Sequence, residues 1–242
     1  MAYRERIAEG GLARWVECVW SLEAAEAVKG WPVRPDGCLD ILYSPAGLEV
    51  VGAMTAEKRF DLAAGTRSAG VRFKPGMAAQ FLRVAAEELT DRTVKLVDVW
   101  GGAAREIEAR LDDAGSVQEC CRVLAASVPA AEARVDGVRR AIEEIIAAGG
   151  DIDLDWVAEQ AGMSERQFRR RCLEESGLAP KQLCRVLRFR RACELGGRGL
   201  PWGLVAAEAG YFDQAHLIRD FREFTGATPM SVFSNTEGGR RG

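Results

Sequence analysis

The sequence predicts an α+β protein in two parts: a β-rich N-terminal domain with helices, of small-barrel or sandwich-like form, followed by an all-helical domain. Two observations support this fold class. Residues 15–73 contain short apolar runs separated by turn-forming residues, a pattern typical of antiparallel strands. After Pro129 the apolar residues follow helical spacing, and a ten-residue pattern occurs there twice. We therefore expect domains at residues 1–130 and 131–242.

In the N-terminal half, turns such as Pro35-Asp36-Gly37 separate five extended runs. The runs cover residues 15–22, 38–43, 48–54, 59–62 and 70–73. After Pro75-Gly76 the spacing becomes helical, and two further helices are expected at 103–111 and 116–127. A short linker rich in Pro and Ala is expected from Pro129 onwards.

In the C-terminal half, residues 155–164 are echoed by residues 204–213. Each copy predicts a short amphipathic helix, a turn glycine and an N-cap residue, which is Ser164 in one copy and Asp213 in the other. The turn glycines are 48 positions apart and the N-caps 49. A second helix follows each copy, at 165–176 and 214–225, and a glycine ends it. Two helices joined by a tight turn containing glycine form a helix-turn-helix unit, and a connecting helix of about 22 Å is expected at 181–195.

The amino-acid composition excludes some classes of function. The chain has 242 residues, 48% apolar and 29% charged, with a net charge of −3. A basic coat over the whole surface is excluded, whereas a local basic stripe is not. No run of about 18 apolar residues and no signal-peptide pattern is found, so we expect a cytoplasmic protein without a membrane partner.

The residues that most enzymes need are scarce. His216 is the single histidine, the seven cysteines include no C-x-x-C pair, and no glycine-rich phosphate-binding motif occurs. We therefore expect no catalytic residues, no metal and no cofactor, and thiols that stay reduced. Catalysis by carboxylates alone stays open, but no pair is marked out.

The first repeat carries a basic helix face. Arg166, Arg169 and Arg170 lie within one 100° arc of the predicted helix, with Phe168 and Cys172 on the opposite side. Residues 164–198 contain ten basic and four acidic side chains, a net charge of +6. Arginine suits bidentate contacts to guanine and to phosphate. A solvated charged face is the alternative for one helix, but the repeated turn favours binding to double-stranded DNA.

The second repeat is less basic. Leu217, Phe221 and Phe224 form its apolar stripe. The side chains expected to face outward or sideways are Gln214, Ala215, Ile218 and Arg219. Such a mixture can bond a base edge and touch a thymine methyl group. For His216, a structural role and a contact with the DNA backbone both stay open.

Residues 135–233 closely resemble the DNA-binding domain of the AraC/XylS family of bacterial transcription regulators. The strongest match is AAEAGYFDQAHLIRDFREFTGATP at 206–229. The resemblance implies seven helices, with two helix-turn-helix units whose reading helices enter successive major grooves about 34 Å apart. By position, the resemblance also implies which residues contact DNA: Arg166, Arg169 and Arg170 in the first unit, and Gln214, Ala215, Ile218 and Arg219 in the second. Residues 35–41, 70–76 and 97–101 more weakly resemble a sensor-like domain with a role in ligand sensing, dimerisation or both.

An effector site in the first half is expected at Trp15, Trp31 and Arg72, because aromatic rings and a guanidinium suit a small ligand of unknown identity. The alternatives are core packing for the tryptophans and an ion pair of Arg72 with Asp36 or Asp40. The function expected is a ligand-responsive transcriptional regulator. A DNA-binding architectural protein without an effector and an enzyme built on the β domain are the other classes.

Two protein partners are compatible with a transcriptional regulator, RNA polymerase and a second copy of the chain. The homodimer is expected through apolar residues of the two helices before Pro129. These residues are Ile107, Leu111, Val117, Cys121 and Leu124. Packing of the same residues on the sheet is the alternative.

Overall fold

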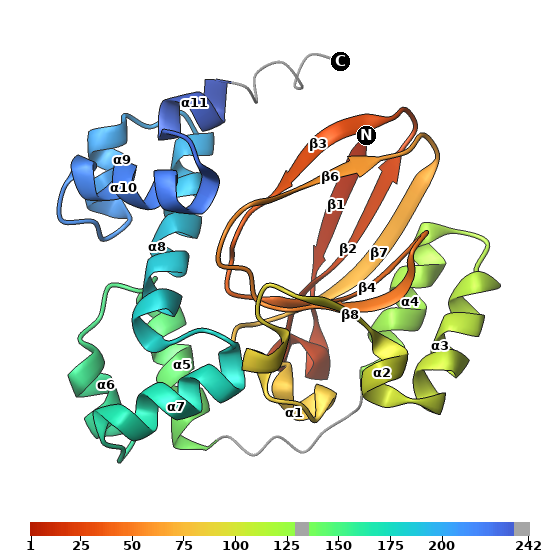
Figure 1. Cartoon of the computed structure of the whole chain (residues 1–242), viewed down its shortest axis with the longest axis horizontal. Helices are drawn as coiled ribbons and strands as arrows, with labels where there is room; N and C mark the ends of the chain where they lie inside the picture. Colours follow the sequence, from red (N-terminus) through yellow and green to blue (C-terminus); the bar gives the residue numbers. More distant parts are fainter. Residues whose placement is uncertain (129–135, 235–242) are drawn as a thin grey trace.

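A computed structural model of the chain describes residues 1–128 and 136–234. Its N-terminal half is built on a six-stranded antiparallel sheet of order β1-β2-β7-β4-β5-β8, with a separate ribbon of β3 and β6 (Figure 1). The strands are β1 (Ala2–Ile7), β2 (Val16–Ala24), β3 (Val28–Val33), β4 (Leu39–Ser44), β5 (Gly47–Val51), β6 (Lys58–Leu62), β7 (Thr66–Phe73) and β8 (Thr93–Lys95). The expected β-rich first half is confirmed.

The five extended runs expected from the sequence correspond to β2, β4, β5, β6 and β7. The strands that were not expected lack a clean apolar alternation. β1 is a mostly exposed edge strand that pairs only with β2, and β3 contains a glycine and a proline. Pairing with a neighbour, which one chain segment does not reveal, stabilises both strands.

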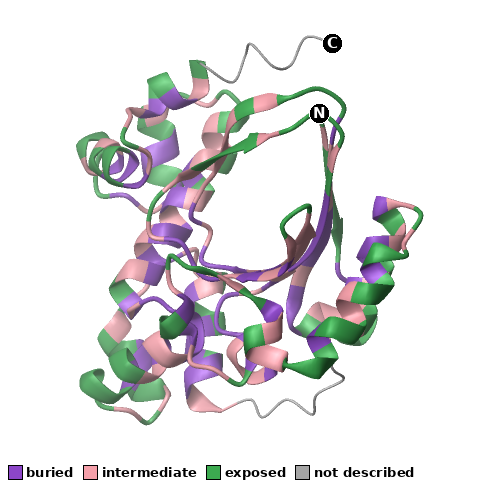
Figure 2. Ribbon diagram, turned by 45° about the vertical axis from the view of Figure 1, so that its right-hand side comes forward, coloured by how far each residue is buried: buried purple, intermediate pink, exposed green. Residues whose placement is uncertain are grey.

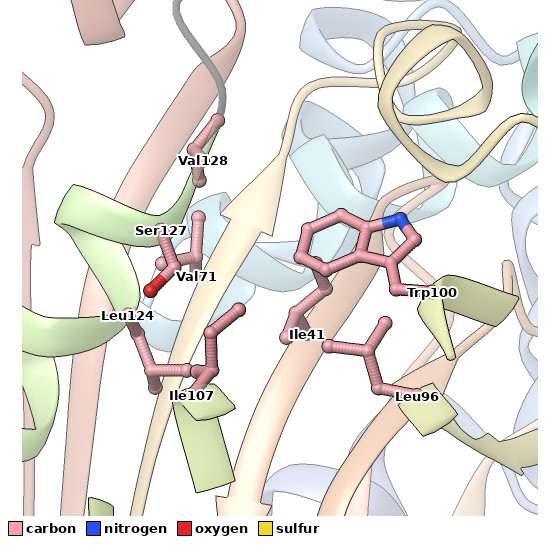
Figure 3. Close-up of a pocket in the computed structure, with 8 residues that line it drawn as sticks. All are labelled: Ile41, Val71, Leu96, Trp100, Ile107, Leu124, Ser127 and Val128. Carbon is pink, nitrogen blue, oxygen red and sulfur yellow. The ribbon is translucent and has the colours of Figure 1, made fainter. Parts of the chain in front are cut away.

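Helices cover one face of the sheet and bury a continuous apolar core against it (Figures 1 and 2). They are α2 (Leu96–Trp100), α3 (Gly102–Asp112) and α4 (Val117–Ser127). Ile41 and Val71 line a cavity of about 10 Å³ from the strands, and Trp100, Ile107 and Leu124 line it from the helices (Figure 3). That volume holds about one water molecule, so the cavity is too small for an effector.

The apolar residues expected at a dimer contact lie inside this core. Leu111, Val117, Cys121 and Leu124 are buried, and Ile107 is partly buried against the same cluster. The alternative, packing on the sheet, is what the structure shows. The expectation of a dimer surface at these residues was therefore wrong, because the sheet already covers their apolar face.

Three short helical turns lie between strands of the sheet, one between β1 and β2 and two between β7 and β8. Seven helices follow in the described part of the second half. The turns are η1 (Gly10–Arg14), α1 (Ala79–Leu82) and η2 (Ala86–Leu89). The helices are α5 (Gly137–Ala147), α6 (Leu154–Gln160), α7 (Glu165–Ser176), α8 (Pro180–Gly197), α9 (Trp202–Glu208), α10 (Gln214–Thr225) and α11 (Pro229–Ser234). The expected pair of helix-turn-helix units, α6–α7 and α9–α10, is confirmed, with α8 running between them (Figure 1). The predicted linker at 129–131 lies outside the described residues.

The caps of the reading helices follow the sequence signals. Ser164 and Gln167 form a capping box at the start of α7, and the Asp213 carboxylate accepts the backbone N–H of His216 at the start of α10. The turn glycines Gly162 and Gly210 have φ of 68° and 76°, a conformation that favours glycine. Local chemistry therefore fixes where both helices begin.

The two halves are in direct contact. The Arg190 guanidinium on α8 forms an ion pair with Glu17 of β2. The Thr90 hydroxyl donates to the carbonyl of Gly177 at 2.7 Å, beside the first helix-turn-helix unit. The backbone N–H of Glu57 donates to the carbonyl of Phe224 at 2.7 Å, in the second unit. The β-rich half thus touches both units and the helix that joins them.

Candidate DNA-binding surface

The predicted basic face of α7 is exposed in the structure. Arg166 and Arg169 are exposed and form no ion pair with any described residue. Arg170 is also exposed and makes a single contact with Glu174 at 3.5 Å. Phe168 and Cys172 are buried on the other side of the helix. The structure therefore brings three arginines together on one solvent-facing surface.

Most other basic side chains of residues 164–198 are bound within the protein. Arg171 pairs with Asp136 at 2.8 Å, and Arg190 pairs with Glu17. Arg188 and Arg191 donate to backbone carbonyls of Gly150 and Glu208. The net charge of +6 therefore overstates the charge available to DNA, because acids from elsewhere in the chain neutralise part of it.

The second reading helix shows the expected division of its faces. Leu217, Phe221 and Phe224 are buried. Gln214, Ala215 and Arg219 are exposed, and Ile218 is half-buried. The His216 ring packs edge-on against Tyr211, with 5.1 Å between ring centroids. This contact supports the structural role for the histidine.

Ion pairs connect both reading helices to neighbouring helices of the domain. On α7, Glu175 forms a buried ion pair with Arg139 of α5 at 3.0 Å. On α10, Asp220 and Glu223 accept hydrogen bonds from Arg185 of α8 at 2.7 and 2.5 Å. The bond from Arg185 holds the pKa of Glu223 below its ordinary value. Sequence reasoning missed these pairs, since their members lie 35 to 38 positions apart.

The contact between Glu17 and Arg190 joins the sheet to α8 in a partly buried setting. Burial alone would raise the pKa of Glu17, but the hydrogen bond and the charge of Arg190 lower it below its ordinary value. The Cys38 thiol also donates to Glu17 at 3.3 Å. Glu17 is therefore a charged acceptor at neutral pH, and it holds the linker helix against the β-rich half.

The residues expected at an effector site do not line one pocket. Trp15 lies in the main core with its ring 5.9 Å from that of Phe81. Phe81 also packs on Phe73, whose side chain points to the face opposite Arg72 because residues alternate along β7. Trp31 lies on the ribbon, paired with Phe60. Core packing explains Trp15, as the alternative interpretation held.

Arg72 forms ion pairs with Glu5, Asp36 and Asp40 at 3.1 to 3.4 Å. Beside it the Trp20 indole lies over Gly70, where an added Cβ would come within 2.3 Å of the ring. The indole N–H donates to Asp40 at 2.6 Å. The ion-pair interpretation of Arg72 is confirmed, and its neighbours already satisfy the guanidinium.

A larger cavity, of about 250 Å³, lies between one end of the sheet and the α3–α4 turn. Its polar lining includes Tyr43, Arg67, Ser68, Asp112 and Ser116. Arg67 is exposed and forms no ion pair with a described residue, whereas the Tyr43 hydroxyl donates to Asp112 at 2.5 Å. No sequence pattern indicated this cavity, because its lining comes from three separate segments.

No helix within residues 1–128 and 136–234 is long and apolar enough to cross a membrane. The same residues contain no cluster of three or more His, Cys, Asp or Glu side chains that could hold a metal ion.

Comparison with known families agrees with the helix-turn-helix geometry. Residues 157–235 match the model of a helix-turn-helix domain, and residues 4–95 match that of a domain of unknown function. No curated protein matches the sequence.

Among solved structures, the chain is similar to ToxT from Vibrio cholerae. An apo ToxT variant is 12% identical with a TM-score of 0.45, over 89% of this chain and 95% of that chain. Wild-type ToxT with a bound unsaturated fatty acid is 11% identical with a TM-score of 0.44, over 88% and 92%. ToxT bound to (E)-4-(8-methylnaphthalen-1-yl)but-3-enoic acid is 9% identical with a TM-score of 0.43, over 97% and 99%. TM-scores below 0.5 transfer no function to this chain.

Proposed function

Because the chain carries an AraC-type helix-turn-helix domain in its C-terminal part, we propose that it is a sequence-specific transcriptional regulator that reads DNA with α7 and α10. One observation carries the proposal: two reading helices flank a single linker helix, and all of their outward side chains except Ile218 are exposed. A structural face would use those side chains in packing or ion pairs. Here the packing falls on the opposite face of each helix.

The two helices differ in chemistry. Arg166, Arg169 and Arg170 suit guanine O6 and N7 atoms and phosphate oxygens. On α10, the Gln214 amide suits adenine, and Ala215 and Ile218 suit thymine methyl groups. Arg219 supplies a cation to the same surface. The proposed site is therefore asymmetric, with a guanine-containing half and a half rich in A·T pairs.

Selection from a random duplex library tests this proposal. The protein should enrich sequences with two shared segments about one helical turn apart, roughly 10 base pairs from centre to centre. Hydroxyl-radical footprinting should protect both segments on one face of the duplex. Enrichment of a single segment, or equal binding to every duplex, would contradict paired reading.

We also propose that a small ligand in the β-rich half modulates DNA binding. The contacts at Glu17, Glu57 and Thr90 reach the linker helix and both helix-turn-helix units, so a change in the sheet can alter the placement of the reading helices. The 250 Å³ cavity beside Arg67 is the better-supported effector site. At Trp31 and Arg72, an anionic ligand would first have to displace the carboxylates bound to Arg72.

Arg67 lines this cavity and its guanidinium forms no ion pair with a described residue, which predicts a small organic anion as ligand. In a panel of carboxylates of three to eight carbons, at least one should raise the melting temperature of the wild type in the millimolar range, since a ligand that binds only the folded state stabilises it. Arg67→Ala should lose this shift and Arg105→Ala, an exposed arginine of α3, should keep it. A shift of equal size in both variants would remove Arg67 from the site, and no shift with any carboxylate would contradict the cavity as an anion site.

An architectural DNA-binding protein without an effector is the second candidate, favoured if DNA binding is found and no ligand is. In either case the chain would act where the chromosome lies, in the cytoplasm of a bacterium. Contact with RNA polymerase and association into a homodimer belong to the regulator proposal. They are tested by pull-down with polymerase holoenzyme and by sedimentation of the full chain.

A further inference from the structure

The two helix-turn-helix turns differ by one residue, and the structure identifies which one. Met163 and Tyr211 occupy equivalent positions, since each donates its backbone N–H to the carbonyl five residues earlier, that of Ala158 or Ala206, at 2.9 Å. In the first unit the N-cap Ser164 follows at once. In the second unit Phe212 stands between Tyr211 and the N-cap Asp213. Phe212 is therefore an insertion specific to the second turn.

The inserted side chain is almost fully exposed and lies outside the apolar core. Phe212 is 94% exposed, against 78% for Ile7 and 71% for Met230, the next most exposed large apolar residues of the described chain. It belongs to neither apolar core cluster. Its neighbour Tyr211, by contrast, is buried and packs on His216. Phe212 is thus exposed to solvent, whereas its neighbour Tyr211 makes the buried aromatic contact of this turn.

The position of Phe212 in the chain favours a contact with DNA. Phe212 directly precedes the N-cap of α10, beside the exposed Gln214 and Ala215 of the first turn. In helix-turn-helix proteins the N-terminal residues of the reading helix contact base edges in the major groove. The apolar groups that B-DNA presents there are the thymine C5-methyl groups.

We propose that Phe212 contacts a thymine C5-methyl group at the edge of the second half-site and so contributes specificity for thymine there. This inference rests on the proposed DNA-binding function. It adds a determinant in the turn, outside the reading helix itself. The first turn has no extra residue, so only the half-site bound by α10 carries this preference.

A duplex in which thymine is replaced by deoxyuracil isolates the methyl group. The starting duplex is one that the wild type selects. The dissociation constants of the wild type and of Phe212→Ala are measured on this duplex. They are then measured on duplexes in which a single thymine of the second half-site is replaced by deoxyuracil. One substitution should weaken the wild type by about 4-fold, the value of one buried methyl-sized group. Phe212→Ala should lose at least as much on the thymine duplex and lose nothing more on that deoxyuracil duplex.

Met230→Ala is the matched control, since Met230 is an exposed apolar residue of α11, the helix that follows α10, and it should bind as the wild type does. Circular dichroism verifies that Phe212→Ala is folded. The proposal is wrong if Phe212→Ala binds the thymine duplex like the wild type, a result that would favour a protein as the partner of the exposed ring. It is also wrong if the effects of Phe212→Ala and of deoxyuracil on the dissociation constant are additive at every thymine. If the wild type selects no duplex at all, the proposed DNA-binding function fails, which this comparison distinguishes from failure of the Phe212 contact.

Discussion

Replacing Arg166, Arg169 and Arg170 together by alanine should reduce specific DNA affinity by at least about 100-fold at ~0.15 M salt. An arginine that reads a base contributes about 1 to 3 kcal/mol, and an arginine bound to a phosphate also strengthens binding. All three side chains are exposed, and the ion pair that the change removes, between Arg170 and Glu174, lies at the surface. Folding should therefore be unaffected. Fluorescence anisotropy with a selected duplex measures the reduced affinity.

The matched control removes three exposed arginines from the β-rich half. Arg105, Arg110 and Arg122 lie on α3 and α4, and their replacement by alanine changes the net charge by the same amount. This variant should bind DNA within about 3-fold of the wild type, because distant exposed charges are largely screened at this salt concentration. Equal reductions in both variants would mean that overall charge, and not the face of α7, determines the affinity.

Arg185→Ala should destabilise the second helix-turn-helix unit strongly. The Asp220 side chain is only 4% exposed, and the substitution leaves its carboxylate without its cation. It also removes the guanidinium that lies over the Phe224 ring at 5.2 Å. Breaking a buried pair costs about 3 to 5 kcal/mol, and we expect a smaller cost, about 2 to 3 kcal/mol, since Arg185 is 29% exposed.

For a chain of this length that cost corresponds to a fall in melting temperature of about 5 to 10 °C, measured by circular dichroism. The double variant Arg185→Ala with Asp220→Asn should recover part of it, because no charge is then left buried. Arg198→Ala, an exposed arginine of the same connection without an ion pair to any described residue, should change little. A melting temperature unaffected by Arg185→Ala would show that the aromatic contacts alone hold α10 on α8.

The sequence predicts an element well when the residues that determine it lie within the element or next to it. Helices 165–176 and 214–225 were predicted with the bounds that the structure shows, because an N-cap and a terminal glycine lie next to each. The linker helix was predicted slightly short at both ends, at 181–195 against Pro180–Gly197. The outward faces of both reading helices followed from 3.6-residue periodicity.

Signals that depend on distant partners gave weaker or wrong expectations. β1 and β3 were missed because their stability comes from the strands beside them. Trp15 and Arg72 were expected in one pocket, yet the pleat and the core place them on opposite faces of the sheet. The apolar residues of α3 and α4 fit a dimer surface and a sheet contact equally well, because the amphipathic pattern does not say what covers it.

The two helix-turn-helix units follow from the amino-acid sequence alone, because caps, turn glycines and apolar stripes act within a dozen residues. Which arginines remain available to DNA depends instead on the folded chain, since acids far along the sequence, such as Glu17 and Asp220, bind Arg190 and Arg185. The exposure of Phe212 has the same origin, because it depends on every element that could have covered the ring. Local interactions fix where helices begin and end, whereas the pairing of charges and the covering of apolar groups are properties of the folded whole.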